Sequence, residues 1–143
     1  MSIQRVSFWC LLIAFSSSLV GCGGSGLDTV PAGGVVNFKG TPIPKIAVVL
    51  MPKDGKGQIA QGVSNDQGKF KLQTRNPGDG ALVGDYLVSF QYVPDEAPEM
   101  PGFTGAKKVK SPIPAKYSDT MTSGFTATIE PDASKNVFAF DLE

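Results

Sequence analysis

The residues that could do chemistry in this chain are few and widely spaced. The 143-residue sequence contains no histidine, which excludes Ser-His-Asp and Cys-His nucleophile pairs and histidine-ligated zinc. Its aspartates occur singly, so a pair of carboxylates placed for acid–base catalysis is not evident. These aspartates include Asp28, Asp54, Asp66, Asp79, Asp85, Asp119 and Asp132. The sequence therefore predicts a protein that is not an enzyme.

Metal and phosphate sites are also poorly supported. Residues 65–68 (Asn-Asp-Gln-Gly) lack the repeated carboxylates and the terminal glutamate of an EF-hand loop. A partial oxygen site that adds Asp79 or Asp85 remains conceivable. The glycine-containing turns 55–57 and 78–80 are not followed by a helical pattern, so they do not predict a phosphate-binding loop. We expect neither a metal nor a cofactor.

A covalent crosslink between the first and last strands is a further alternative. Lys39 and Asn136 lie near the two ends of the domain, where some related surface sandwiches join a lysine to an asparagine. The strand parity argues against it, because Asn136 shares the face of Phe138 whereas Lys39 lies opposite Phe38. No carboxylate catalyst is evident either.

Charge and cysteine content narrow the class of protein further. Without residues 1–21, which contain Arg5, 12 basic and 13 acidic side chains remain. This balance gives no reason to expect a nucleic-acid partner. The two cysteines are Cys10, in the apolar leader, and Cys22. A structural disulfide is therefore not expected, and packing alone must hold the fold together.

The first 21 residues have the pattern of a secretory signal peptide. A short start containing Arg5 precedes about fifteen mostly apolar residues, 6–20. That run is short for a bilayer-spanning helix, which needs about 20 residues. A retained membrane helix is the alternative. We expect cleavage after Gly21, and residues 22–32 would then carry a glycine-rich, flexible tether.

The tetrapeptide Leu19-Val20-Gly21-Cys22 resembles the lipobox of bacterial lipoproteins. The resemblance implies that the thiol of Cys22 receives diacylglycerol, that cleavage makes Cys22 the first mature residue, and that its amine accepts an acyl chain such as palmitate. Two or three chains hold a protein on a membrane permanently, since each buried methylene contributes about 0.8 kcal/mol. The residue after Cys22 is Gly23 and not aspartate, which resembles the sorting signal of lipoproteins directed to the outer membrane.

From residue 33 onward the apolar pattern has a period of two. Residues 46–51 are apolar on both faces, which predicts a central strand. Residues 69–73 alternate, with Phe70 and Leu72 predicted to point inward. Further strands are expected at 34–38, 58–64, 84–92, 125–129 and 137–141. With turns rich in Gly and Pro between them, they predict an all-β protein: an antiparallel Greek-key sandwich of about seven strands over residues 33–143.

Between Val93 and Ser118 the strand pattern lapses and prolines recur. A long segment of this kind is either a crossover between sheets or a functional loop. In the second case Phe103 and Tyr117 would contact a partner. Tyr92, at the end of the preceding strand, is a third candidate contact.

The order of the motifs resembles carboxypeptidase regulatory-like domains, which have a transthyretin-like (prealbumin-like) sandwich. The motifs are Gly34-Val35-Val36 to Gly40-Thr41-Pro42-Ile43, then Ala47-Val48-Val49, Asn65-Asp66-Gln67-Gly68-Lys69-Phe70, and Gly84-Asp85-Tyr86-Leu87-Val88. The segment from Ile113 to Phe125 also resembles small bacterial lipoproteins with that domain. In the turn, Asp66 is expected to accept backbone N–H groups and Gly68 to take a positive φ, while Phe70 and Tyr86 would fill the core. The resemblance implies a fold and surface display, with no shared catalytic residues.

The sequence thus predicts a lipid-anchored, non-catalytic protein of the bacterial cell envelope, at the outer membrane rather than the inner one. It would act as a structural or binding module whose partner is an envelope protein, a peptide or a glycan. One alternative is a carbohydrate- or peptide-binding accessory module of a surface enzyme or transporter, which would use Tyr92, Phe103 and Tyr117. Another is a hydrolase that uses two carboxylates in one pocket.

Overall fold

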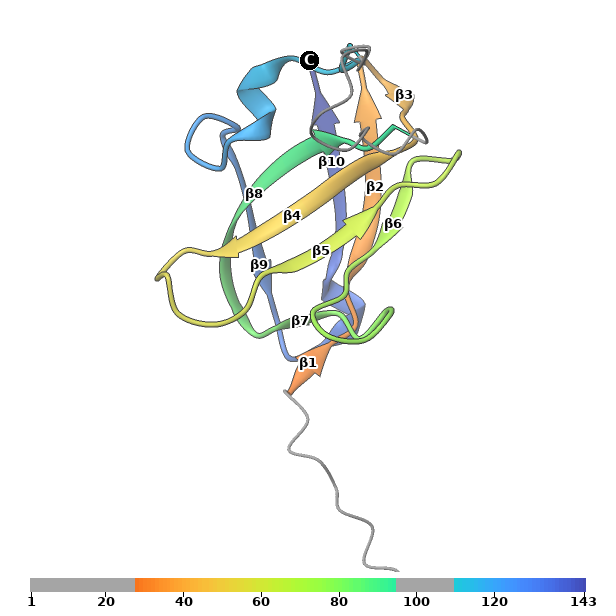
Figure 1. The fold of residues 1–143 in the computed structure, drawn as a ribbon. Coiled ribbons are helices and arrows are strands. Elements are labelled where there is room, and N and C mark those ends of the chain that lie inside the picture. The colour runs from red at the N-terminus through yellow and green to blue at the C-terminus, as the bar shows by residue number, and fades with distance from the viewer. Residues whose placement is uncertain (1–27, 95–109) are drawn as a thin grey trace, which may run out of the picture.

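The structure is a computed structural model that describes residues 28–94 and 110–143 (Figure 1). The predicted signal peptide, its cleavage site at Gly21, the predicted lipid carrier Cys22 and the candidate contact Phe103 lie outside these ranges. The described residues form two four-stranded β-sheets that pack together and a further two-stranded sheet, which confirms the predicted all-β sandwich. Seven of their ten strands have three residues or more.

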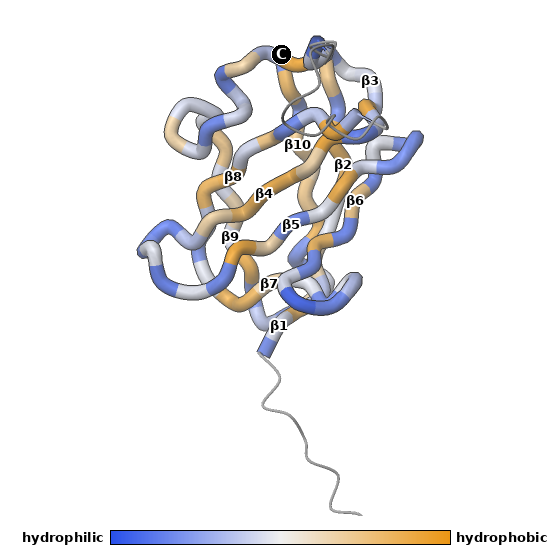
Figure 2. Tube along the Cα trace, viewed as in Figure 1, coloured by the Kyte–Doolittle hydropathy of each residue, from blue (hydrophilic) through white to orange (hydrophobic). Residues whose placement is uncertain are grey.

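One sheet has the strand order β5-β4-β8-β9 and is antiparallel throughout. β4 (Ile46–Pro52) and β8 (Gly84–Tyr92) are its inner strands, and β5 (Ala60–Val63) and β9 (Phe125–Ile129) are its edges. The prediction of a central strand at 46–51 is therefore confirmed. Apolar residues occupy both faces of β4, and the tube of Figure 2 is hydrophobic along most of this strand.

The second sheet is built around β2 (Gly33–Phe38), which pairs with β10 (Val137–Leu142) on one side and with β3 (Thr41–Pro42) and β6 (Lys69–Lys71) on the other. The β2–β10 pair is parallel, unlike the other strand pairs of the described residues. The parallel direction arises because the chain enters both strands from the same end of the molecule. Backbone hydrogen bonds close both ends of the pair, from Gly33 N to Asn136 O (3.0 Å) and from Lys39 N to Leu142 O (2.8 Å).

The folded domain starts earlier than residue 33. Within the predicted tether, β1 (Thr29–Val30) pairs with β7 (Ala81–Leu82). The backbones of Gly80 and Val30 approach each other closely here, since a Cβ added at Gly80 would meet the carbonyl oxygen of Val30. The backbone amide of Leu72 also donates to Ala32 O at 2.8 Å. Residues 28–32 therefore belong to the sandwich, because backbone pairing holds them there.

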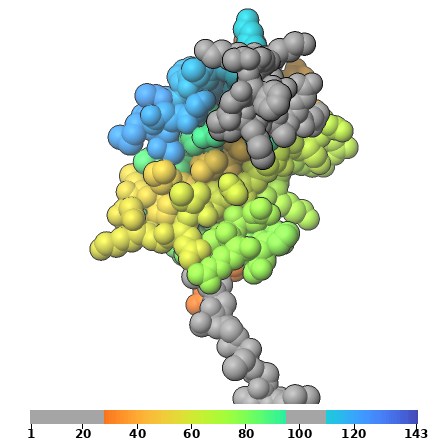
Figure 3. All heavy atoms as spheres, viewed as in Figure 1, coloured from red at the N-terminus to blue at the C-terminus, as the bar shows by residue number. Residues whose placement is uncertain are grey.

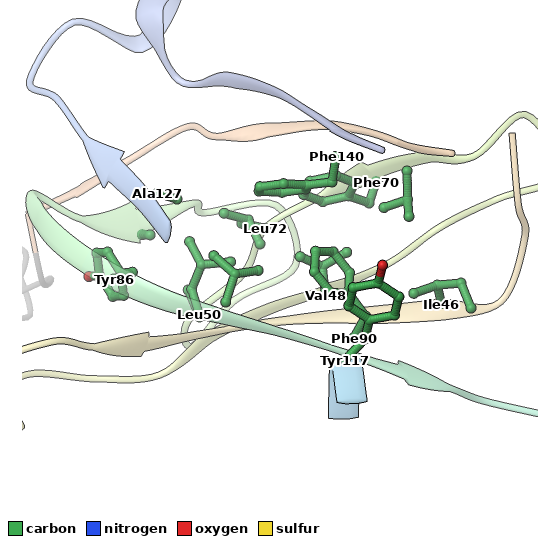
Figure 4. Close-up of a cluster of buried hydrophobic side chains, with 14 of the residues drawn as sticks. Ile46, Val48, Leu50, Phe70, Leu72, Tyr86, Phe90, Tyr117, Ala127 and Phe140 are labelled. Carbon is green, nitrogen blue, oxygen red and sulfur yellow. The ribbon is translucent and has the colours of Figure 1, made fainter. Parts of the chain in front are cut away.

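The core lies between the two sheets, as Figure 4 shows. Phe70 and Phe140 extend from the β2 sheet toward Val48, Leu50 and Phe90 of the other sheet. The ring of Phe90 is at the centre of an aromatic group, with centroids 5.2 Å from Phe140 and 5.3 Å from Phe125. As predicted, Phe70, Leu72 and Tyr86 are buried. Each such aromatic side chain buries roughly 150–250 Å², so this group dominates the hydrophobic stabilisation.

The turn before β6 differs from the prediction by one residue. Asn65, and not Asp66, accepts the backbone hydrogen bonds, since its Oδ1 lies 3.0 Å from both Gln67 N and Lys69 N. Gly68 takes φ = 71°, as predicted. The side-chain amide of asparagine accepts such bonds as readily as aspartate does, so the residue type alone did not distinguish the two positions.

Helical structure in the described ranges is confined to two short 3-10 segments, η1 (Ala115–Ser118) and η2 (Ala133–Lys135). No helix in those ranges is long and apolar enough to cross a membrane. β1 and the C-terminus lie at opposite ends of the sandwich in Figure 1. In Figure 3 the segment from β4 to β7, yellow to green, makes up much of the visible face.

Candidate binding surface

The aspartates expected to serve turns are engaged in local hydrogen bonds. Asp79 accepts three backbone N–H groups, from Thr74 (2.6 Å), Asn76 (2.9 Å) and Arg75 (3.0 Å). The bonds from Thr74 and Asn76 are the main causes that hold the pKa of Asp79 below its ordinary value. Asp79 is therefore a carboxylate that stabilises a turn, and its oxygens have little capacity left for a cation.

Asp132 has a similar local role before η2. Its carboxylate accepts the hydroxyl of Ser134 at 2.7 Å and the amide of the same residue at 3.0 Å. The hydroxyl bond is the first cause of its lowered pKa. Across the described ranges, 28–94 and 110–143, no three metal-ligating side chains come close enough together to hold a cation.

The possible crosslink between Lys39 and Asn136 is excluded by the register of β2 and β10. Lys39 follows the last residue of β2, whereas Asn136 precedes the first residue of β10, and the two strands run parallel. The residues are therefore separated by the length of a six-residue strand, about 20 Å. Asn136 is 1% exposed, and its amide group bonds to Glu130 N (2.8 Å) and Glu130 O (2.9 Å). Its role is to join the end of β9 to the start of β10.

Tyr117 belongs to the core, which corrects the prediction that it contacts a partner. Its side chain is 4% exposed, and its ring packs edge-on against Phe90 at 6.3 Å, as the close-up shows (Figure 4). Its hydroxyl donates to Glu143 O (3.0 Å) and accepts from Glu143 N (2.9 Å). The prolines and the charges around Tyr117 suggested a surface loop, but its ring fills the open end of the sandwich.

Tyr92 remains a candidate contact residue. It is half-buried at the end of β8 and packs against the rim of the core. The structure places it opposite Ile46 in the β4–β8 pair, at the end of the molecule away from β1 (Figure 1). Of the three predicted aromatic contacts, Tyr92 is the one that the described surface leaves partly accessible.

A depression with a volume of about 1150 Å³ runs over β6 and its neighbours. Valines of five strands or strand ends line it: Val35, Val49, Val63, Val93 and, from β10, Val137. Amide groups of Gln61, Gln73 and Gln91 interrupt this apolar lining. We call this depression the β6 groove. Its mixture of aliphatic contacts and amides suits a ligand that is itself partly apolar and partly polar.

The charged groups of the β6 groove are lysines. Lys69 and Lys71 line it, and neither aspartate nor glutamate is among its described lining residues. Both lysines point away from the core because the buried side chain of Phe70 lies between them in β6. The described lining therefore favours a neutral or acidic ligand.

A smaller depression of about 770 Å³ lies beside β1, at the end where the chain enters the sandwich. Asp28, Asp54 and Asp85 line it together with Lys53 and Lys56. Asp85 accepts the hydroxyl of Thr128 at 2.6 Å, and Asp54 accepts the amide of Lys56 at 2.9 Å. This is where the hydrolase alternative would have to place its two carboxylates.

Tyr86 forms the wall of this smaller depression. Its hydroxyl donates to Leu82 O at 2.9 Å. Burial, and secondly the charge of Asp54, raise the pKa of Tyr86. The phenol therefore stays protonated at neutral pH, as its donated hydrogen bond requires.

Comparisons of the chain with protein-family models, with curated proteins and with solved structures found no match. The class that fold and surface define is accordingly a small all-β sandwich with a lysine-containing groove along one flank.

Several residues with defined roles were missed by sequence reasoning. Ser64 is one of them: its hydroxyl donates to Ile43 O (2.8 Å) and accepts from Ile46 N (2.9 Å), which fixes the entry to β4. Asn136 and Tyr117 have comparable roles at the ends of β10. The partners of Ser64 and Tyr117 lie 18 to 26 residues away in sequence, so they could not be named from local sequence.

Proposed function

We propose that this chain is a lipid-anchored, non-catalytic β-sandwich protein of the bacterial cell envelope that acts as a structural or binding module. The observation that carries the proposal is the position of β1. The chain enters the sandwich at β1, which begins seven residues after the predicted lipid carrier Cys22 in sequence, while the C-terminus lies at the other end of the sandwich (Figure 1). A lipid on Cys22 would therefore hold the β1 end toward the membrane, at the outer membrane in our preferred assignment.

The length of chain before β1 sets how far the sandwich can move from the membrane. Residues 22–28 can span at most about 25 Å, because an extended residue covers no more than about 3.6 Å. The β6 groove on the flank would thus be displayed near the membrane surface.

The lining of the β6 groove supports binding rather than catalysis. It combines valines with three glutamines and two lysines. Strand edges nearby offer backbone N–H and C=O groups, which is the arrangement used when an extended peptide is bound. A neutral or acidic peptide segment of another envelope protein is the partner that this surface fits best.

Anchoring is tested by Cys22→Ser in cells that process lipoproteins. The variant should keep its leader, fail to incorporate labelled fatty acid and leave the membrane fraction after high-salt and carbonate washes. Ser25→Ala is the matched control and should behave like wild type. If Cys22→Ser changes neither mobility nor membrane partition, the anchor proposal is wrong.

Binding through the β6 groove is tested by crosslinking and pull-down from intact envelopes. The double variant Lys69→Glu/Lys71→Glu should lose a captured acidic partner, whereas Lys110→Glu, outside the groove, should retain it. If all variants capture the same proteins to the same extent, the groove is not the binding surface.

The carbohydrate- or peptide-binding accessory module is the second candidate, and the groove favours its peptide form. Sugar binding usually uses exposed aromatic faces, but Tyr117 is buried and the two aromatic residues of the described groove lining, Phe70 and Phe138, are buried or half-buried. Binding to a glycan array that is lost in Tyr92→Ala would support a carbohydrate-binding module instead. The hydrolase alternative requires an activity that both Asp54→Asn and Asp85→Asn abolish.

The family assignment is part of this proposal. The order of the turn and strand motifs supports a Greek-key, transthyretin-like domain of the carboxypeptidase regulatory-like type. Such a domain would serve here as a display scaffold.

A further inference from the structure

β10 is an edge strand whose outer side has no partner among the described residues. Hydrogen bonds to β2 use the carbonyls of Asn136 and Leu142, at the two ends of the pair. Since backbone groups alternate in direction along a strand, the even-numbered residues of β10 face β2. The N–H and C=O groups of Val137, Ala139 and Asp141 therefore face away from the sheet.

Tyr117 closes one end of this free edge. Its hydroxyl bonds to both the N–H and the C=O of Glu143, the next residue whose backbone groups face outward. At the other end, Asn136 follows η2, where the strand begins. The free edge thus consists of the outward groups of residues 137, 139 and 141, with Ala139 at its centre.

We propose that two copies of this chain pair through their β10 edges, antiparallel about a two-fold axis at Ala139. In this register Val137 lies opposite Asp141 of the second copy, and Ala139 lies opposite its own equivalent. All three outward residues then form hydrogen-bonded pairs. A register shifted by two residues pairs only two of them, because the N–H and C=O groups of Glu143 are already bonded to the hydroxyl of Tyr117.

The side chains at this edge fit a second copy of the chain. On the core side, the half-buried Phe138 would lie opposite Phe140 of the other copy. Phe138 already stacks on Phe140 within one chain, at 5.8 Å and 11°. Cross-strand aromatic pairs of this kind stabilise sheets, and pairs without hydrogen bonds bring the side chains closest. The self-paired register would therefore extend the aromatic group across the interface and cover Phe138.

Exposed apolar surface favours the same arrangement. Val137 is 74% exposed on the outer face, and apolar edge strands without protection tend to pair with another chain. The charges near the strand are engaged within one chain, since Lys135 pairs with Glu130 (2.8 Å) and Asp141 accepts a hydrogen bond from Asn37 (2.7 Å). A second copy is thus complementary in hydrogen bonding and shape.

Single cysteines test this arrangement in the full chain within envelope membranes. The Cα atoms of opposed Ala139 residues would be about 5.5 Å apart, within reach of a thiol crosslinker with a short spacer. Ala139→Cys should therefore give a product of twice the chain's mass. Wild type reports any reaction of Cys10 or Cys22, and Ile59→Cys, which is exposed just before β5 and outside the β6 groove, reports random collision.

A mixed pair of variants tests the register. Val137→Cys and Asp141→Cys should crosslink when the two chains are produced together. Each alone should not, because like positions would be about 14 Å apart, four residues along the strands. The proposal is overturned if Ala139→Cys gives no dimer or no more dimer than Ile59→Cys. It is also overturned if Val137→Cys alone crosslinks as well as the mixture does, or if the product contains a different protein.

A proline variant tests the same edge without a crosslinker. The N–H of Ala139 faces away from β2, so Ala139→Pro removes no hydrogen bond of the monomer. In detergent, wild type should sediment as a dimer and unfold at a temperature that rises with concentration. Ala139→Pro should sediment as a monomer with a concentration-independent unfolding temperature. If Ala139→Pro is folded and remains dimeric, this edge is not the interface.

Discussion

The hydroxyl of Tyr117 lies between the amide and the carbonyl of Glu143, 2.9 Å from the nitrogen and 3.0 Å from the oxygen. One side chain thus bonds to both backbone groups of a residue as a neighbouring strand would. At the same time its ring fills the core beside Phe90 and Phe125, at 6.3 and 6.0 Å. Tyr117 therefore joins the segment before β9 to the last residue of the chain.

Two substitutions separate these roles of Tyr117. Tyr117→Phe keeps the ring and removes both hydrogen bonds, so we expect a loss of about 1 kcal/mol in the free energy of unfolding. Tyr117→Ala also removes the buried ring and should cost about 3–5 kcal/mol. Denaturant titrations followed by fluorescence or circular dichroism measure both. Equal effects of the two substitutions would show that the ring contributes nothing.

Asn136 provides a second test of a buried polar connection. Asn136→Ala removes the two bonds that its amide makes with the backbone of Glu130 and leaves those groups shielded from water. We expect a loss of about 2–3 kcal/mol in unfolding free energy. Asn37→Ala is the matched control, because its bond to Asp141 is exposed (2.7 Å) and should contribute less than about 1 kcal/mol. Similar losses in the two variants would contradict the assigned role of Asn136.

Gly34 is required by the close approach of β2 and β10. A Cβ at this position would lie 1.9 Å from the carbonyl oxygen of Phe138, which is backbone and cannot rotate away. Gly34→Ala should therefore cost at least about 2 kcal/mol, as overpacking does elsewhere. Thermal unfolding should show a marked decrease in midpoint, whereas Gly78→Asn, in open space at a positive φ, should unfold close to wild type. A wild-type midpoint for Gly34→Ala would mean that β2 and β10 do not pair in this register.

Asp79 links the stability of its turn to pH. Its pKa is depressed in the folded state, chiefly by the hydrogen bond from Thr74, so its contribution is present above the unfolded pKa of about 3.9 and is lost as pH falls through the folded value. Asp79→Asn lacks the charge and should lower the unfolding temperature at pH 7. The difference in unfolding temperature between Asp79→Asn and wild type should become smaller below about pH 4. A difference that is constant from pH 7 to pH 3 would contradict this linkage.

Much of the sheet structure was predictable because it depends on local patterns. Alternation identified β6 and β8, and an apolar run on both faces placed β4 inside its sheet. The turn before β6 was located correctly but assigned to Asp66 in place of Asn65, since both side chains can accept the same bonds. Local sequence therefore located the turn but did not identify the residue that accepts its hydrogen bonds.

Long-range relationships could not be predicted in the same way. The parallel pairing of β10 with β2 depends on which end of the sheet the chain enters, and alternation is the same in either direction. Tyr117 was placed on the surface because prolines surround it, although its ring is buried by residues on β8, β9 and β10. The β6 groove combines side chains from several strands, and no single stretch of sequence carries its pattern.

The parallel pair of β2 and β10 also bears on how this domain folds. Its paired residues, such as Gly33 and Val137, are 104 positions apart in sequence. Closing so long a loop costs chain entropy before burial of Phe140 and Leu142 offsets that cost. The strand pair that holds the two ends of the domain together is therefore one of its slowest contacts to form.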